Sequence, residues 1–284
     1  MKVVSFQVPH IMREAFKIQL DRMPHFYEKL HQHQEIQIMW IEKSAGTMIA
    51  GDYVGRFNAG DLYIIGSFQA HVFLNDPVYF NTDSNLGASS VSLFFDEKYL
   101  GRVFWQLDEM DETRRLVEKA ARGFKVLGNT RNSIISLIKK VVNQKGVDKL
   151  ITFFSIIKLL SESREMEILS VMASKENFGR NEGKRMNDIL QFTLRESHRK
   201  VYIDEVAKVA NLTEEAFCRY FKTRTGKTYT NFLNEVRVSQ ACKMLIDKDL
   251  SIQDICFQSG FSNLSNFNRA FKKVTGKTPS KYLS

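Results

Sequence analysis

Hydrophobic and polar positions change their spacing along the 284-residue chain. Up to about residue 95, short runs rich in Ile, Val and aromatic side chains alternate with turns of Gly, Asn and Asp, which is typical of β-strands. From about residue 96 onward, apolar side chains recur three and four positions apart, which is typical of amphipathic helices. The pattern therefore predicts an α+β chain in which β-structure comes first and helices follow.

The N-terminal part predicts several short strands. They are expected at residues 35–42, 47–50, 62–65, 71–74 and 91–95, with turns at 43–46 and 58–61. Many short strands separated by turn residues indicate an antiparallel β-sandwich or β-barrel.

The middle of the chain predicts helices. They are expected at residues 96–107, 111–124, 129–144 and 147–161. The last two carry broad apolar stripes, formed by Ile134, Leu137, Ile138 and Val141 and by Leu150, Phe153, Phe154, Ile157 and Leu160. Such stripes suit either packing within the chain or contact with a second copy. Residues 163–182 are polar and unpatterned and are interpreted as an interdomain linker, after which a helix is expected at 185–197.

The strongest pattern is an internal repeat near the C-terminus. The sequence Thr-Gly-Lys-Thr at Thr225–Thr228 recurs fifty positions later at Thr275–Thr278, and the pair Phe217 and Phe221 recurs with the same shift. A period near fifty indicates a repeated structural unit. Each copy predicts a short helix, a tight turn and a second helix. The signals are a turn residue (Asn211, Gly260), an N-cap (Thr213, Ser262) and a terminating glycine (Gly226, Gly276).

A short helix, a tight turn and a second helix with a polar face form a helix-turn-helix unit, whose second helix reads the major groove of DNA. The two units are expected at residues 203–224 and 251–274. A helix at 229–246 would join them as a rod of about 27 Å. That rod could hold the two reading helices about one DNA turn, or about 34 Å, apart.

The exposed faces of the second helices supply the candidate DNA-binding residues. In the first copy they are Thr213, Glu214, Glu215, Cys218, Arg219 and Lys222, and in the second they are Asn263, Leu264, Ser265, Asn266, Asn268, Arg269, Lys272 and Lys273. Arginine suits guanine and asparagine suits adenine, whereas lysines at the helix ends suit phosphates. A merely solvated helix face is the alternative for either copy alone, but two copies in register favour DNA binding.

Residues 181–284 resemble the DNA-binding domain of the AraC/XylS family of bacterial transcription regulators. The resemblance is carried by Leu250–Tyr282, with SIQDICFQSGFSN and then NFNRAFKKVTGKTPSKY. It implies a sequence-specific regulator, usually an activator, that binds double-stranded promoter DNA and contacts RNA polymerase. The chain departs from the family at Leu283, where Arg is usual, and at Glu214 and Glu215, whose carboxylates repel phosphates.

Charge supports a polyanionic partner. The net charge is +9, and residues 181–284 hold 18 Lys+Arg against 11 Asp+Glu, whereas residues 1–180 hold 23 against 21. The excess lies on the candidate DNA-binding domain, as a nucleic-acid partner requires. Three cysteines without metal-like spacing indicate reduced thiols. No stretch reads as a signal peptide or a membrane span, so a cytoplasmic protein without a membrane partner is expected.

One cluster of ionisable residues stands out in the N-terminal part: His31, His33, Glu35 and His71. With Gly46, Gly60 and Asp61 they resemble the cupin-type sensor domain of the same family. Alternation along a strand puts His31, His33 and Glu35 on one face. The cluster is interpreted as a non-catalytic effector site, with no metal, no cofactor and no catalytic residue. The alternatives are a hydrogen-bond cluster at a barrel mouth and a metal-dependent cupin enzyme with an accessory DNA-binding domain. In the cupin metal pattern the glutamate follows the histidine pair by three or four residues, but Glu35 follows after one.

The expected domains follow from these segments. Residues 1–162 form a cupin-like sensor and dimerisation domain, with a barrel at 1–95 and helices at 96–162. Residues 163–182 form the linker and residues 183–284 the DNA-binding domain. Helices after the barrel carry the dimer contact in the family that the chain resembles, so a homodimer is expected here.

Overall fold

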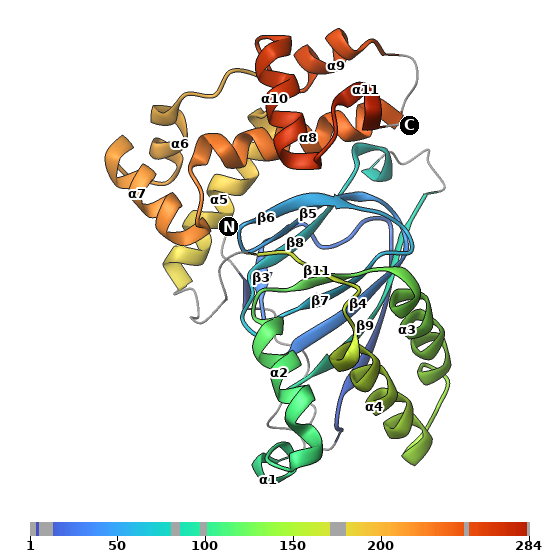
Figure 1. Cartoon of the computed structure of the whole chain (residues 1–284). Helices are drawn as coiled ribbons and strands as arrows, with labels where there is room; N and C mark the ends of the chain where they lie inside the picture. The colour runs from blue at the N-terminus through green and yellow to red at the C-terminus, as the bar shows by residue number, and fades with distance from the viewer. Residues whose placement is uncertain are drawn as a thin grey trace. The chain divides into compact units, whose positions relative to one another are not determined.

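The computed structural model describes residues 4–5, 14–80, 86–96, 101–170, 180–246 and 250–282. The chain divides into two compact units. The N-terminal unit takes residues 4–177 except 54–56, and the C-terminal unit takes residues 178–284. Residues 4–177 contain two β-sheets and the helices that cover one of them, and the regular elements described from residue 180 onward are helices (Figure 1).

The N-terminal unit contains two sheets. The first has the order β1 (Val4–Ser5), β3 (His31–Gln32), β8 (His71–Asn75), β5 (Gly46–Ala50) and β6 (Tyr53–Phe57). The second has the order β11 (Met166–Ile168), β10 (Phe124–Val126), β7 (Leu62–Ile65), β4 (Ile36–Lys43), β9 (Ala88–Phe95) and β2 (Lys17–Met23). Long ladders such as β4–β9 and β2–β9 are antiparallel, and β1 pairs with β3 in parallel. The predicted antiparallel architecture is confirmed as two sheets.

Strand β4 explains how the core is layered. Ile38 and Trp40 point to one face, where they join the helices α3 (Gly128–Val141) and α4 (Gly146–Glu162) in one hydrophobic cluster. Met39 and Ile41 point to the other face and join Phe73 of the first sheet in a second cluster. Because successive side chains of a strand point to opposite faces, the nearly continuous apolar run of β4 serves both layers.

Helices after the sheets cover the second sheet (Figure 1). Besides α3 and α4, they are α1 (Arg102–Trp105), the 3-10 helix η3 (Asp108–Met110) and α2 (Asp111–Ala120); a further 3-10 turn, η1 (Pro77–Phe80), precedes β9. Phe153 of α4 is fully buried and stacks on Phe16, with ring centroids 4.1 Å apart. The predicted stripes of α3 and α4 therefore pack at least partly within the chain.

The C-terminal unit contains seven helices among its described residues: α5 (Arg180–Glu196), α6 (Ile203–Val209), α7 (Glu214–Thr225), α8 (Tyr229–Ile246), α9 (Ile252–Gln258), α10 (Leu264–Thr275) and α11 (Pro279–Tyr282). The pairs α6–α7 and α9–α10 are the two predicted repeats, and α8 spans the predicted connecting helix. Asn211 has φ 54° and Gly260 has φ 89°, so both predicted turn positions are left-handed. Gly226 and Gly276 end α7 and α10 in the left-handed conformation, as predicted.

Several predictions were wrong in detail. The helix expected at 96–107 appears only as α1, and residues 97–100 lie outside the described part. Phe124, expected in a helix, belongs to β10, and Met166–Ile168, expected in the linker, pairs with β10 as β11. These strands have three residues each, too few to show a period of two. Strand β2 was not predicted at all.

A close approach between a sheet and a helix gives a test of this packing. A β-carbon on Gly66, next to β7, would lie 2.2 Å from the carbonyl oxygen of Ala120 at the end of α2. Gly66→Ala should therefore lower the free energy of unfolding by about 1–3 kcal/mol, because the helix end must move. Urea unfolding followed by tryptophan fluorescence measures this, since both tryptophans, Trp40 and Trp105, lie in this unit.

The matched control is Gly87→Ala, whose new methyl group would meet Met23 at an ordinary 3.4 Å. It should change the free energy of unfolding by less than about 0.5 kcal/mol. Equal losses in the two variants would contradict the predicted contact between the end of α2 and the sheet.

Candidate functional site

The faces of α7 and α10 that carry the predicted DNA-binding residues are open to solvent. All fourteen of those residues, from Thr213 to Lys222 and from Asn263 to Lys273, are exposed in the free chain. The opposite faces are closed, because Phe217, Phe221, Phe267 and Phe271 are fully buried. Each second helix therefore presents a polar face of the kind that can enter a DNA groove.

The start of α10 differs from the prediction. The N-cap is Asn263, whose side-chain oxygen accepts a hydrogen bond from the Asn266 backbone N–H at 2.8 Å, so the prediction of Ser262 was wrong by one residue. Asn263 stands fifty positions after Thr213, which caps α7 in the same way by accepting from the Ala216 N–H. The repeat thus keeps its period of fifty at the cap.

The second copy also orients its arginine. The Arg269 guanidinium donates to the Asn266 side-chain oxygen at 2.9 Å, one helical turn earlier. This bond holds the guanidinium beside the helix start, where α10 would meet base edges. It also occupies the oxygen that Asn266 would need for a bidentate contact with adenine. Arg269 and Asn266 therefore act as one unit, and the Asn263 oxygen is already committed to the cap.

The first copy carries a different charge pattern at the same place. Glu214 and Glu215 occupy the first turn of α7, where their carboxylates face the unpaired N–H groups of the helix start. Among the residues that the structure describes, no acceptor is hydrogen-bonded to the Arg219 guanidinium. The start of α7 is therefore acidic, whereas the start of α10 carries no acidic residue. Arg269 of α10 is hydrogen-bonded to Asn266, and Arg219 of α7 has no corresponding bond among the described residues.

Aromatic packing fixes α7 on the connecting helix. The rings of Phe217 and Phe221 lie 5.3 and 5.4 Å from that of Tyr229, and Phe221 lies 5.3 Å from Phe232. The Tyr229 hydroxyl is hydrogen-bonded to Thr193 of α5 at 2.9 Å. Burial raises the pKa of Tyr229 to about 12, so the hydroxyl stays protonated at neutral pH. Helix α7 therefore packs on α8, and the Tyr229–Thr193 hydrogen bond joins α8 to α5.

The N-terminal unit contains a cavity of about 300 Å³. Three of the four predicted effector residues, His31, His33 and His71, line it. Their rings gather closely, with centroids 4.3 Å apart for His31 and His71 and 5.1 Å apart for His33 and His71. The other lining residues are Gln19, Asp21, Met23, Phe26, Tyr27, Gln37, Met39, Phe73 and Phe94. The cavity is mostly apolar with a few polar groups, which is typical of a small-molecule site.

The three histidines are held in the same way. Each Nδ1 lies 2.7–2.9 Å from a backbone carbonyl oxygen, of Lys29, Glu35 and Gln69 respectively. A carbonyl can only accept, so in the neutral rings of His31 and His71 the Nδ1 carries the proton and the Nε2 is an acceptor, whereas the His33 Nε2 lies 3.2 Å from the Gln37 side-chain oxygen. His71 is 1% exposed, and its Nε2 has no hydrogen-bond partner in the described structure. A buried acceptor without a partner is costly, so this atom marks a place for a donor.

Burial also sets the charge of the cluster. Desolvation lowers the pKa of His31 to about 4 and lowers the pKa of His33. The pKa of His71 falls well below its usual value, again mainly through burial and then through the neighbouring histidines. All three rings are therefore neutral at pH 7.

Glu35, the fourth predicted effector residue, does not line the cavity. It contacts the cluster through its backbone carbonyl, which accepts from His33. Among the described residues, no group of three or more His, Cys, Asp and Glu side chains is arranged to hold a metal ion. The sequence reading missed Asp21 and Gln19, which reach the cavity on β2. Their signal is non-local, because β2 is brought there by pairing with β9.

Comparisons with known proteins support a DNA-binding regulator. A family model described as a helix-turn-helix domain matches residues 206–284. The chain is 34% identical over 99 residues to the probable transcription factor PqrA of Proteus vulgaris. The aligned region covers 34% of this chain and 81% of PqrA. It is 22% identical over 277 residues to the transcriptional activator RhaR of Enterobacter sp., with 91% and 88% covered. ToxT from Vibrio cholerae has 16% identity and a TM-score of 0.37, with 95% and 98% covered.

No helix among the described residues is long and apolar enough to cross a membrane.

The histidine cluster predicts a dependence of stability on pH. Below the ordinary histidine pKa of 6.5 the unfolded chain takes up protons that the buried rings do not, down to about pH 4 for His31. The free energy of unfolding of the N-terminal unit should therefore fall as the pH falls from about 6.5 toward 4. Because His71 takes up one of these protons when the chain unfolds, His71→Leu should reduce the slope by up to about 1.4 kcal/mol per pH unit.

Urea unfolding followed by tryptophan fluorescence at several pH values measures the slope. The control is His198→Leu, which removes an exposed histidine of the other unit and should leave the slope unchanged. The same slope in His71→Leu and the unsubstituted chain would contradict a neutral buried ring.

Proposed function

Because the chain belongs to the AraC/XylS family of DNA-binding transcription regulators, we propose that it binds promoter DNA with both of its second helices, α7 and α10. The observation that carries this proposal is the repeat itself. Two helix-turn-helix units, fifty residues apart in sequence, each bury a phenylalanine pair and expose the opposite polar face. One reading helix would need only one such face.

The proposed contacts differ between the helices. On α10, Arg269 reads a guanine while Asn266 holds its guanidinium, and Asn268 is free to contact a neighbouring base. Lys272 and Lys273, in the last turn, bind phosphates. On α7, Arg219 reads a base and Lys222 binds phosphate, while Glu214 and Glu215 reject nearby phosphates. The second copy is therefore the stronger reader.

The proposed output is activation. RhaR, which matches most of this chain, is named a transcriptional activator. We extend that role to this protein, with RNA polymerase as the partner and the cytoplasm as the compartment. A homodimer fits the exposed apolar pair Val147 and Ile151, which lie four residues apart on α4 and are 70% and 58% exposed.

The regulatory signal is proposed to be a small molecule in the histidine cavity. Neutral rings and the Asp21 carboxylate offer acceptors, and the lining contains no lysine or arginine. The unpartnered Nε2 of His71 accepts from the ligand, so the ligand is a partly apolar molecule with a hydroxyl or N–H donor and no negative charge. The proposal assigns no enzymatic step to the cavity, and Glu35, the carboxylate that the alternative metal-dependent enzyme would use, lies outside its lining.

Selection from random DNA duplexes at fixed salt tests the reading helices. The full chain should enrich two short base blocks about one DNA turn apart. Arg269→Ala should weaken binding to the enriched site by about 1–3 kcal/mol and relax preference at one position of one block, because a bidentate guanine contact is lost. Sequencing of the selected pool reports both effects.

The control in that selection is Lys273→Ala. Loss of a phosphate contact should weaken binding to all sequences alike and reduce its salt dependence, with base preference intact. An unchanged preference in Arg269→Ala would contradict the proposed role of Arg269, and a single enriched block would show that only one helix reads bases.

Calorimetric titration with a matched pair of probes tests the cavity. Of 2-naphthol and 2-naphthoate, the neutral hydroxyl compound should bind and the carboxylate should not. His71→Leu should weaken 2-naphthol binding by about 1 kcal/mol, because the acceptor is removed. His198→Leu is again the control. Binding of the carboxylate in preference, or equal 2-naphthol affinity after His71→Leu, would contradict the assigned ligand chemistry.

A further inference from the structure

One arginine of the connecting helix holds a corner of the first half of the C-terminal unit. Arg237, in the middle of α8, donates from Nε to the Ser197 carbonyl oxygen at 2.9 Å and from Nη2 to the Arg199 carbonyl oxygen at 2.6 Å. Both acceptors lie in the corner between α5 and α6. These bonds join α8 to the backbone segment that leads into the first helix-turn-helix unit.

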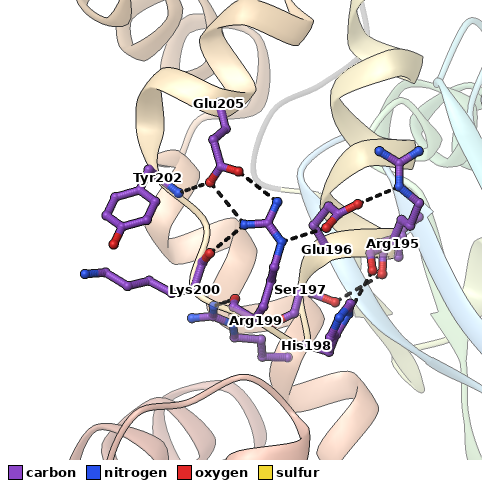
Figure 2. Close-up of polar contacts among 10 residues, drawn as sticks. Arg195, Glu196, Ser197, His198, Arg199, Lys200, Tyr202 and Glu205 are labelled. Carbon is purple, nitrogen blue, oxygen red and sulfur yellow. Dashed lines mark hydrogen bonds and ion pairs between the residues drawn. The ribbon is translucent and has the colours of Figure 1, made fainter.

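The corner itself is stiffened by ion pairs (Figure 2). The Arg199 guanidinium bonds both oxygens of Glu205 on α6, at 2.8 and 3.2 Å, and donates to Glu196 of α5 at 2.7 Å. Glu205 also accepts from the Tyr202 backbone N–H at 2.8 Å. The hydrogen bond from Arg199 lowers the pKa of Glu205, so the carboxylate is charged at neutral pH. A fork-to-fork pair fixes direction as well as distance, so the corner keeps one shape.

The turn of the second unit packs directly against the same corner. A β-carbon on Gly260, in the turn between α9 and α10, would lie 2.0 Å from the Ser197 carbonyl oxygen and 2.9 Å from Arg237 Nε. Gly260 also has φ 89°. The neighbouring Phe261 ring lies 5.6 Å from the Arg237 guanidinium carbon. Arg237 therefore touches both halves, and only a glycine allows the second turn to come so close.

The corresponding turn of the first copy is exposed. Asn211 takes the same left-handed conformation there, and its side chain is open to solvent. The close contact of Gly260 with Ser197 and Arg237 is thus not a property of the repeated unit. It belongs to the way in which the second copy is placed on the first.

We propose that Arg237, with the Ser197 and Arg199 carbonyls and Gly260, sets the spacing between the two DNA blocks that the protein recognises. The proposal rests on the proposed function, in which both helices read bases. Helix α7 is seated on the start of α8 by aromatic packing, and α10 is seated on its later part in a separate cluster. Two modules on one helix can tilt or rotate relative to each other, and the corner contact removes that freedom. Arg237 is in this sense a positioning residue that need not touch DNA.

The chemistry of the contact favours a directional role over mere packing. Burial lowers the pKa of Arg237, which reports the desolvation of its charge. An apolar side chain would fill the same space beside Phe261 without that penalty. What only the guanidinium supplies is two aimed hydrogen bonds to two carbonyls of a corner that is forty residues away in sequence.

The test uses the full chain and duplexes in which the two selected blocks are separated by spacers of graded length. The unsubstituted chain should show a sharp optimum at one length. Arg237→Met should keep the base preference within each block but bind duplexes with several neighbouring spacer lengths. Its affinity at the optimal spacer should fall about tenfold, because binding to the second block is no longer favoured by a fixed geometry. Arg237→Lys, which can reach only one carbonyl well, should fall between the two.

The control is Arg195→Met, which removes an exposed guanidinium that pairs with Glu196 and leaves both Arg237 bonds in place. It should keep the sharp optimum. Hydrogen exchange gives a second readout: amides at 197–202 and 259–261 should exchange faster in Arg237→Met and not in Arg195→Met. A sharp optimum in both Arg237 variants, with normal exchange, overturns the inference alone. A single block or none in the unsubstituted chain overturns the proposed function as well.

Discussion

The burial of two phenylalanine pairs determines which faces of α7 and α10 are exposed to solvent. Phe217 and Phe221 in α7, and Phe267 and Phe271 in α10, are four residues apart and fully buried. On a helix that spacing defines one face, so its burial leaves the opposite face to solvent. The helix caps, the connecting helix α8 and the charged side chains add to this arrangement. Without the two pairs, neither helix would have a defined outer surface.

Electrostatics then distinguishes the two outer surfaces. At the start of α7, Glu214 and Glu215 interact favourably with the helix dipole and unfavourably with a phosphate. At the start of α10, Asn263 satisfies a backbone donor without charge, so stability and DNA approach are not in conflict there. The charges at the start of α7 thus stabilise the helix but would repel an approaching phosphate, whereas the neutral cap of α10 stabilises its helix without that repulsion.

The sequence predicted the repeat well because its signals are local. Phenylalanine spacing, left-handed turn residues and terminating glycines all lie within one unit, and together they placed α6 to α10 almost to the residue. The N-terminal unit shows the opposite case. Phe124–Val126 and Met166–Ile168 are strands because each pairs with a distant partner, and three residues cannot reveal that. The cavity follows the same rule: the His31 and His33 pair was visible in sequence, whereas Asp21 arrives on a strand whose partner lies seventy residues away.

The unequal turns also bear on how such a regulator can change over generations. At Asn211 the side chain is exposed, so a substitution there is restricted mainly by the left-handed backbone, which favours Asn or Gly. At Gly260 any side chain would displace a carbonyl of another segment, so a change there disturbs both halves at once. The two copies share one pattern but are not interchangeable. Substitution is restricted by backbone conformation at the first turn, and by both backbone conformation and a neighbouring segment at the second.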